Sequence, residues 1–113
     1  MILLLTLLFF KHYVVDFILQ TDDMVAHKGI YGDPIGIDHS LYHAMSTLMI
    51  LMLFTFPIWA LILALLDGLL HYHIDYVKMA YGNRDIKTKA FWNQLGLDQF
   101  LHALTYIGIV AII

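Results

Sequence analysis

Four long apolar stretches, separated by polar residues or turns, constrain what this chain can fold into more than any other feature. A transmembrane helix needs about 20 mainly apolar residues, and four such helices fit within the 113 residues of the chain. The predicted helices cover residues 1–20, 39–56, 58–81 and 90–113. The sequence therefore predicts an all-α fold, with residues 1–113 forming a single transmembrane domain, an integral membrane four-helix bundle.

Composition supports a membrane protein and excludes several other classes. Hydrophobic residues make up 61% of the chain and the mean hydropathy is +0.77, whereas soluble domains are roughly 45–50% apolar. The formal net charge of -3 leaves no basic surface for the phosphates of nucleic acid. The chain has no cysteine, which excludes disulfides, thiolate metal sites and cysteine nucleophiles.

Turn and capping residues mark the connections. Glycines and the pair Asp33-Pro34 lie in the first polar connection, residues 21–37, where they favour turns over helix. Asp38 is expected to cap the second helix, and Gly82 is expected to end the third. The apolar run over residues 1–10 lacks a basic leader and a small-residue cleavage site, so we expect a retained helix.

Basic residues predict the orientation, because Lys and Arg accumulate in cytoplasmic loops. Five of them flank or occupy the two polar connections: Lys28, Lys78, Arg84, Lys87 and Lys89. Both connections are therefore predicted to be cytoplasmic, and both termini to lie on the non-cytoplasmic side of a multi-pass inner-membrane protein. Lys11 lies inside the first span, where it is expected to snorkel or to pair with an acid.

Each predicted helix carries two polar residues four positions apart, which places both on one helical face. The pairs are His12/Asp16, His39/His43, His71/Asp75 and Asp98/His102. Because consecutive helices run in opposite directions, the pairs are predicted to stack as two layers at similar depth. Asp16, His39, Asp75 and Asp98 form the shallow layer, nearer the cytoplasm, and His12, His43, His71 and His102 form the deep layer.

These layers favour a metal site. Ionisable groups cost about 2.5–3.5 kcal/mol each in hydrocarbon on insertion scales, so they usually face a bundle interior and mark function. Mixed histidine and carboxylate ligands suit Zn²⁺, Mn²⁺ or Fe²⁺, and helix bundles build such sites from facing helices. We predict that all eight residues bind a divalent metal, zinc before manganese or iron. An Asp that is not a ligand, Asp67 or Asp16, is the predicted general base.

The alternative is a purely structural polar network. In that case each Asp accepts a hydrogen bond from a neighbouring His, and Lys78, near the Asp75 face, neutralises one carboxylate. His73 is out of phase with the third pair and His27 lies in a connection, so neither is a first-choice ligand.

The motifs also occur in a fixed order along the chain. They are His12-x-x-x-Asp16-Phe17-x-Leu19-Gln20-Thr21, then Lys28, His39-x-x-x-His43, His71-x-x-x-Asp75-x-x-Lys78 and Asp98-Gln99-x-x-His102. This pattern resembles the domain-of-unknown-function 3307 family of small bacterial and phage integral membrane proteins, over nearly the whole chain. The resemblance implies a membrane bundle in which the matched residues matter, and it implies no activity. More distantly, His-x-x-x-His on an apolar helix is similar to small inner-membrane proteins described as metal-dependent hydrolases.

The leading hypothesis is a membrane-embedded metal-dependent hydrolase with its site open to the cytoplasmic leaflet, acting on a lipid or lipid-linked substrate. A metal-ion or proton transporter or channel is the first alternative, although residues 1–10 and 50–56 contain no polar residue except threonine. A haem-binding electron carrier and a non-catalytic membrane partner subunit are the others. Membrane lipids are the expected partners and nucleic acid is not. The sequence leaves open whether the chain forms a homo-oligomer.

Overall fold

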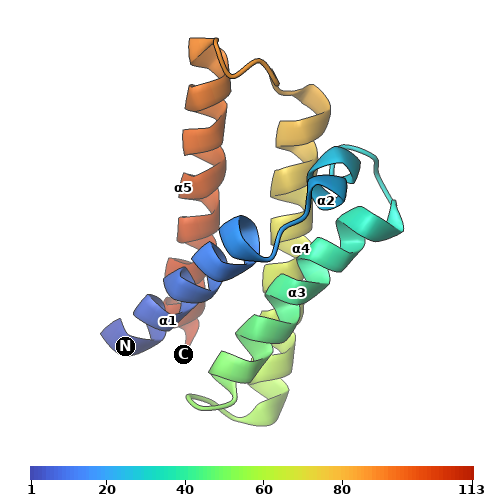
Figure 1. Ribbon diagram of the computed structural model, residues 1–113. Helices are drawn as coiled ribbons and strands as arrows, with labels where there is room; N and C mark the ends of the chain where they lie inside the picture. The colour runs from blue at the N-terminus through green and yellow to red at the C-terminus, as the bar shows by residue number, and fades with distance from the viewer.

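The computed structural model describes residues 1–113 and contains only helices and their connections (Figure 1). Helix α1 (Ile2–Tyr13) continues into a π-helical turn, η1 (Val14–Ile18), and the short helix α2 (Asp22–His27) follows. Three longer helices complete the chain: α3 (Pro34–Leu51), α4 (Pro57–Tyr81) and α5 (Lys89–Ile112). The predicted all-α class is confirmed.

Two helices, α4 and α5, are long and apolar enough to cross a membrane. They contain 25 and 24 residues, whereas a span needs about 20. Large apolar side chains on both helices face outward, among them Leu65, Leu69 and Ile107. Many large exposed apolar side chains on one helix pair are typical of a contact with lipid or with another protein.

The structure differs from the prediction at the first connection. Instead of irregular chain over residues 21–37, α2 forms there and α3 begins at Pro34. The side chain of Asp33 caps α3 by accepting a hydrogen bond from the backbone N–H of Ile35, 2.9 Å away. Proline is favoured at the first helical position, where no N–H is needed. The prediction of Asp38 as the cap is therefore wrong, because Asp33-Pro34 starts a helix here and does not interrupt one.

Threonine and proline fix other helix ends. Thr21 caps α2 and Thr88 caps α5, each by accepting a backbone N–H three residues further on. Helix α3 ends at Leu51, earlier than predicted. Phe56 has an extended backbone, as expected for a residue that precedes proline, and Pro57 then begins α4.

Helices α3 and α4 form a closely packed antiparallel pair, with α5 beside α4 and α1 against α3 and α5 (Figure 1). A Cβ atom on Gly68 would lie 2.9 Å from the Cβ of Ala44 and 3.3 Å from the carbonyl oxygen of Ser40. Only glycine therefore allows this close approach. An aspartate side chain is short, so an Asp of α4 can contact a side chain of α3 only if the two helices pack this closely.

An apolar core fills the end of the bundle where both termini and the α3–α4 turn lie (Figure 1). It consists of Leu4, Leu8, Leu51, Ala60, Leu63, Tyr106 and Ile109. The paired polar residues come from the other half of each helix, toward the polar connections. The molecule thus divides into an apolar half and a half with a polar interior.

Candidate metal centre

All eight residues of the predicted layers lie inside the bundle. Each is at most 8% exposed. They come from the four longest helices and the π-helical turn: His12 from α1, Asp16 from η1, His39 and His43 from α3, His71 and Asp75 from α4, and Asp98 and His102 from α5. Helical spacing alone therefore identified a set of side chains that the structure brings together.

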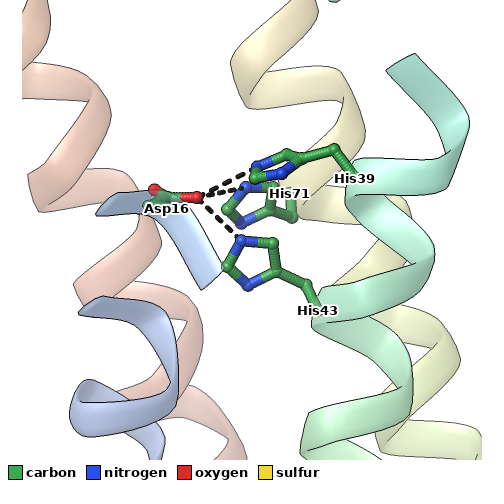
Figure 2. A group of neighbouring side chains, drawn as sticks. All are labelled: Asp16, His39, His43 and His71. Atoms are coloured by element: carbon green, nitrogen blue, oxygen red, sulfur yellow. Dashed lines mark hydrogen bonds and ion pairs between the residues drawn. The ribbon is translucent and has the colours of Figure 1, made fainter. Parts of the chain in front are cut away.

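Asp16 is the centre of a first group of ligand-type atoms (Figure 2). Its Oδ1 lies 3.0 Å from Nε2 of His39, 2.8 Å from Nε2 of His43 and 3.5 Å from Nε2 of His71. Its Oδ2 lies 3.0 Å from Nε2 of His12. Four imidazole nitrogens from three helices thus surround one carboxylate, so the two layers interlock at Asp16.

The π-helical turn η1 directs this carboxylate inward. Val15 and Asp16 are buried, while the next two residues, Phe17 and Ile18, are exposed. The side-chain amide of Gln20 donates a hydrogen bond to the Asp16 carbonyl, 3.0 Å away. Single π turns within α-helices occur frequently at functional sites.

The spacing in the first group fits a tetrahedral ion. Zinc binds imidazole nitrogen and carboxylate oxygen at about 2.0–2.2 Å, which puts two ligand atoms about 3.3–3.5 Å apart. The three distances from Asp16 Oδ1 to His39, His43 and His71 run from 2.8 to 3.5 Å. Shifts of about half an ångström would accommodate the ion. The donor set and its geometry therefore fit a divalent metal.

A second group shares His71 with the first. Nε2 of His71 lies 3.1 Å from Asp75 Oδ2, and Nε2 of His102 lies 3.1 Å from Asp75 Oδ1. Asp98 Oδ1 follows at 3.5 Å from the same nitrogen of His102. The rings of His43, His71 and His102 stack with centroids 3.5 and 4.0 Å apart. Since one imidazole nitrogen binds one ion at a time, His71 serves one group at any moment.

Lysines neutralise three of the four buried carboxylates. The pairs, with their N–O distances, are Lys11–Asp67 at 2.8 Å, Lys28–Asp75 at 2.9 Å and Lys78–Asp98 at 3.3 Å. Asp16 makes no ion pair with a lysine and faces imidazoles instead. With neutral imidazoles, the cluster therefore carries one uncompensated negative charge, and that charge belongs to Asp16.

The lysine partners differ in part from the sequence-based expectation. Lys11 pairs with an acid, which was one of its two expected roles. Lys78, near the Asp75 face, is expected to neutralise one carboxylate, and it does so at Asp98 of α5. Asp75 is instead taken by Lys28, which approaches from the segment after α2.

Asp67 lies outside both groups. Its Oδ2 accepts hydrogen bonds from Lys11 Nζ and from the Thr47 hydroxyl. The same Lys11 Nζ lies 3.0 Å from Nδ1 of His43. Because an ammonium can only donate, this nitrogen accepts, and Nε2 of His43 carries the ring proton and donates to Asp16. Lys11 thus assigns the tautomer of His43.

Several buried atoms in the cluster lack a hydrogen-bond partner. They are Nε2 and Nδ1 of His71, Nδ1 of His39, Oδ2 of Asp75 and Oδ1 of Asp98. Buried polar groups nearly always have partners. A cation would satisfy Asp98 Oδ1 and His71 Nε2, while Asp75 Oδ2 already has an ion-pair contact with Lys28. The Nδ1 atoms of His39 and His71 have none of the outer hydrogen-bond acceptors that usually orient metal-bound imidazoles.

The His/Asp spacing misses two hydroxyl groups of the network. The Tyr106 hydroxyl lies 2.7 Å from Nδ1 of His12, and Thr47 donates to Asp67. Tyr106 follows His102 by four residues and Thr47 follows His43 by four. Extending each polar face by one turn, and including hydroxyls, would have found both.

The two histidines excluded by the sequence lie outside both groups. His27 Nδ1 bonds to the carbonyl of Asp23. His73 bonds to the Tyr31 hydroxyl and to a backbone carbonyl of its own helix.

A pocket of about 450 Å³ between α4 and α5 reaches the edge of the cluster. Lys78 and Asp98 line its polar end, and Asp98 borders His102. Its apolar wall includes Ile74, Val77, Leu97 and Leu101. The pocket thus has one polar and one apolar side, and it ends at Asp98 on the edge of the second group.

Fold and site together define an all-helical protein with a buried His/Asp cluster that could hold a metal ion, and with two helices able to cross a membrane. The chain belongs to the family described as "Protein of unknown function (DUF3307)", whose model matches residues 4–113. The family resemblance of the sequence is thereby confirmed. No curated protein and no solved structure matches the chain.

Proposed function

We propose that this chain is a membrane-embedded, metal-dependent hydrolase whose divalent ion, zinc by preference, is held by Asp16, His39 and His71. One observation carries the proposal: Asp16 alone among the four buried carboxylates has no lysine partner and is surrounded by imidazole nitrogens. An unpaired buried charge is costly. A divalent cation supplies the missing positive charge and uses the imidazole lone pairs at the same time.

Three ligands and one hydrogen-bond donor favour a catalytic over a structural site. Lys11 keeps a proton on Nε2 of His43, so His43 remains outside the ligand set while its N–H points at Asp16. Structural zinc sites have four protein ligands, whereas catalytic sites have three and keep a position for water. A metal in such a site supplies a water that ionises near neutral pH. His43 lies where it can hydrogen-bond an oxygen in that position.

This arrangement changes the candidate for proton transfer. Asp67 and Asp16 are the bases predicted from the sequence, but Asp67 reaches the group only through Lys11, and Asp16 is a ligand in the proposal. His43 connects Asp16 on one side with Lys11 on the other. We therefore assign the general-acid role to His43, because Nε2 carries a proton to give and Nδ1 can take one from Lys11.

The proposed membrane placement is a four-span bundle with both termini outside the cytoplasm. Basic residues in the two polar connections favour this orientation. Both termini and the α3–α4 turn lie at one end of the molecule, which supports it (Figure 1). The pocket between α4 and α5 suits a lipid or lipid-linked substrate from the cytoplasmic leaflet, because its apolar wall leads to Lys78 and Asp98.

The alternatives have less support. A transporter or channel needs a polar path through the whole bundle, and the apolar core at the terminal end offers none. Haem ligation by two deep-layer histidines needs space for the macrocycle between the rings. The rings of His43, His71 and His102 stack at 3.5 and 4.0 Å, which leaves no such space.

The test is lipid hydrolysis by the purified chain in nanodiscs of defined phospholipids, with products followed by mass spectrometry. We expect turnover that requires zinc, is lost in His71→Ala, and falls about 100-fold or more in His43→Gln, the usual range for a missing proton-transfer group. His27→Ala is the matched control and should retain full activity, because the His27 ring lies outside both groups and bonds to the Asp23 carbonyl. Hydrolysis that persists after chelation, or none across glycerophospholipids and lipid-linked phosphates with zinc-loaded protein, contradicts the proposal.

A further inference from the structure

The second group of ligand-type residues already contains a cation, and the chain itself supplies it. Lys28 directly follows α2, yet it is only 5% exposed. Its Nζ lies 2.9 Å from Oδ2 of Asp75, in the group formed with His71 and His102. Lysine is almost never fully buried unless it is paired, so this contact is the reason that Lys28 enters the bundle.

We propose that Asp75, Asp98 and His102 form a second metal site that the Lys28 ammonium keeps occupied, so that the native chain binds one ion and a chain without Lys28 binds two. The inference rests on the proposed function for the first ion, at Asp16. It assigns Lys28 a role that no helical spacing indicates.

The ligands of the second site are present without His71. When His71 serves the ion at Asp16, Asp75 and His102 remain, with facing atoms 3.1 Å apart. Asp98 adds Oδ1, 3.5 Å from the same nitrogen of His102. Oδ1 of Asp98 is buried and lacks a hydrogen-bond partner, whereas Oδ2 of Asp75 contacts the Lys28 ammonium. Two carboxylates and one imidazole are a ligand set that divalent zinc, manganese or iron accepts.

The ammonium and a second metal ion exclude each other. A metal between His102 and Asp98 would lie about 2.0–2.2 Å from the facing oxygen of Asp75, Oδ1. The Lys28 ammonium lies 2.9 Å from Oδ2 of the same carboxylate, so the two cations would share one carboxylate. Two cations a few ångströms apart also repel strongly where little water is present. Because Lys28 is tethered, it competes at high effective concentration with an ion from solution.

The backbone around Lys28 is held close to the site. A Cβ atom on Gly36 of α3 would lie 3.1 Å from the carbonyl oxygen of His27 and 3.4 Å from Cα of Lys28. Helix α3 therefore packs directly against the segment that carries the lysine. This contact fixes where the side chain starts and keeps its ammonium within reach of Asp75.

The experiment counts zinc per chain by elemental analysis after equilibration at one fixed free zinc concentration. We expect one zinc in the native chain, two in Lys28→Met, and one in Lys87→Met, an exposed lysine that serves as matched control. Adding His102→Ala to Lys28→Met should return the count to one. A single zinc in Lys28→Met, or two in the native chain, overturns the inference.

The two proposals fail separately in this design. The count in the native chain tests the ion at Asp16, and the increase on removing Lys28 tests the second site. A Lys28→Met chain that folds only with zinc also supports the inference, because zinc then replaces the lost ammonium at Asp75. A chain that stays unfolded at saturating zinc overturns it.

Discussion

Replacing Lys11 by methionine is expected to destabilise the protein by about 3–5 kcal/mol, the typical cost of removing one partner of a buried ion pair. Nζ of Lys11 lies 2.8 Å from Asp67 Oδ2, and the two side chains are 5% and 1% exposed. Methionine retains most of the apolar stem, so the loss reports the charge. Asp67 would keep only the Thr47 hydroxyl as a donor, which cannot neutralise a buried carboxylate.

The assay is a double-mutant cycle, measured by reversible unfolding in mixed micelles. Asp67→Leu alone should cost a similar amount, because it leaves the ammonium unpaired. The double variant Lys11→Met/Asp67→Leu should lie within about 1–2 kcal/mol of the native chain, since apolar pairs often replace buried ion pairs without loss. Lys87→Met, at an exposed position, should change stability by no more than about 0.5 kcal/mol.

Additive single effects would refute the reasoning. If the coupling energy stays below about 0.5 kcal/mol, Lys11 and Asp67 do not act as a pair. Asp67 would then be a second uncompensated carboxylate. Asp16 would then no longer be the one buried carboxylate without a lysine partner.

Two further predictions concern helix packing and metal-linked stability. Gly68→Ala should destabilise by about 1–3 kcal/mol as an overpacked contact, because its Cβ would lie 2.9 Å from that of Ala44. Gly108→Ala meets nothing within 4 Å and should be neutral or stabilising by up to about 1 kcal/mol; equal melting temperatures for the two variants would contradict the close α3–α4 approach. Chelation from 100-fold above the dissociation constant should lower stability by about 2.7 kcal/mol, a shift expected to vanish in His71→Ala and to persist in His73→Ala. If calorimetry shows the same shift in both histidine variants, the ion is bound elsewhere.

The convergence of the eight polar residues could be predicted from sequence because it depends on helix geometry alone. Residues four apart share a face whatever surrounds the helix, and a costly buried polar face must turn toward the bundle interior. His12, His43, His71 and His102 therefore lie in one cluster, as the spacing predicts. The same reasoning, extended to hydroxyls, reaches Thr47 and Tyr106.

The lysine partners could not be predicted in this way, because they depend on tertiary packing. Lys28 reaches Asp75 only because α2 forms and returns the chain against α3. The sequence-based interpretation of residues 21–37 as irregular left Lys28 without a position. Lys78 is three residues from Asp75, but the approach of α5 offers it Asp98 instead.

The four-residue spacing also could not predict that the polar residues divide into two groups of ligand-type atoms. Spacing predicts layers of residues, whereas the structure shows which oxygen faces which nitrogen. The tautomer of His43 depends on Lys11, a contact between residues 32 positions apart. The pattern therefore indicated where the polar cluster lies, and only the contacts indicate which of its members can be ligands.

The most direct test of the central claim is the metal content of Asp16→Asn beside that of the native chain and of Asp23→Asn, an exposed acid. All three proteins are equilibrated at the same free zinc concentration, separated from unbound metal and analysed for zinc per chain. The proposal predicts one zinc in the native chain and in Asp23→Asn, and almost none in Asp16→Asn. Loss of an outer hydrogen-bond partner weakens metal binding about 10–100-fold, and loss of a ligand should weaken it further. Equal zinc in Asp16→Asn and the native chain, or no zinc in any of the three, would contradict the assignment of Asp16 as the metal-binding carboxylate.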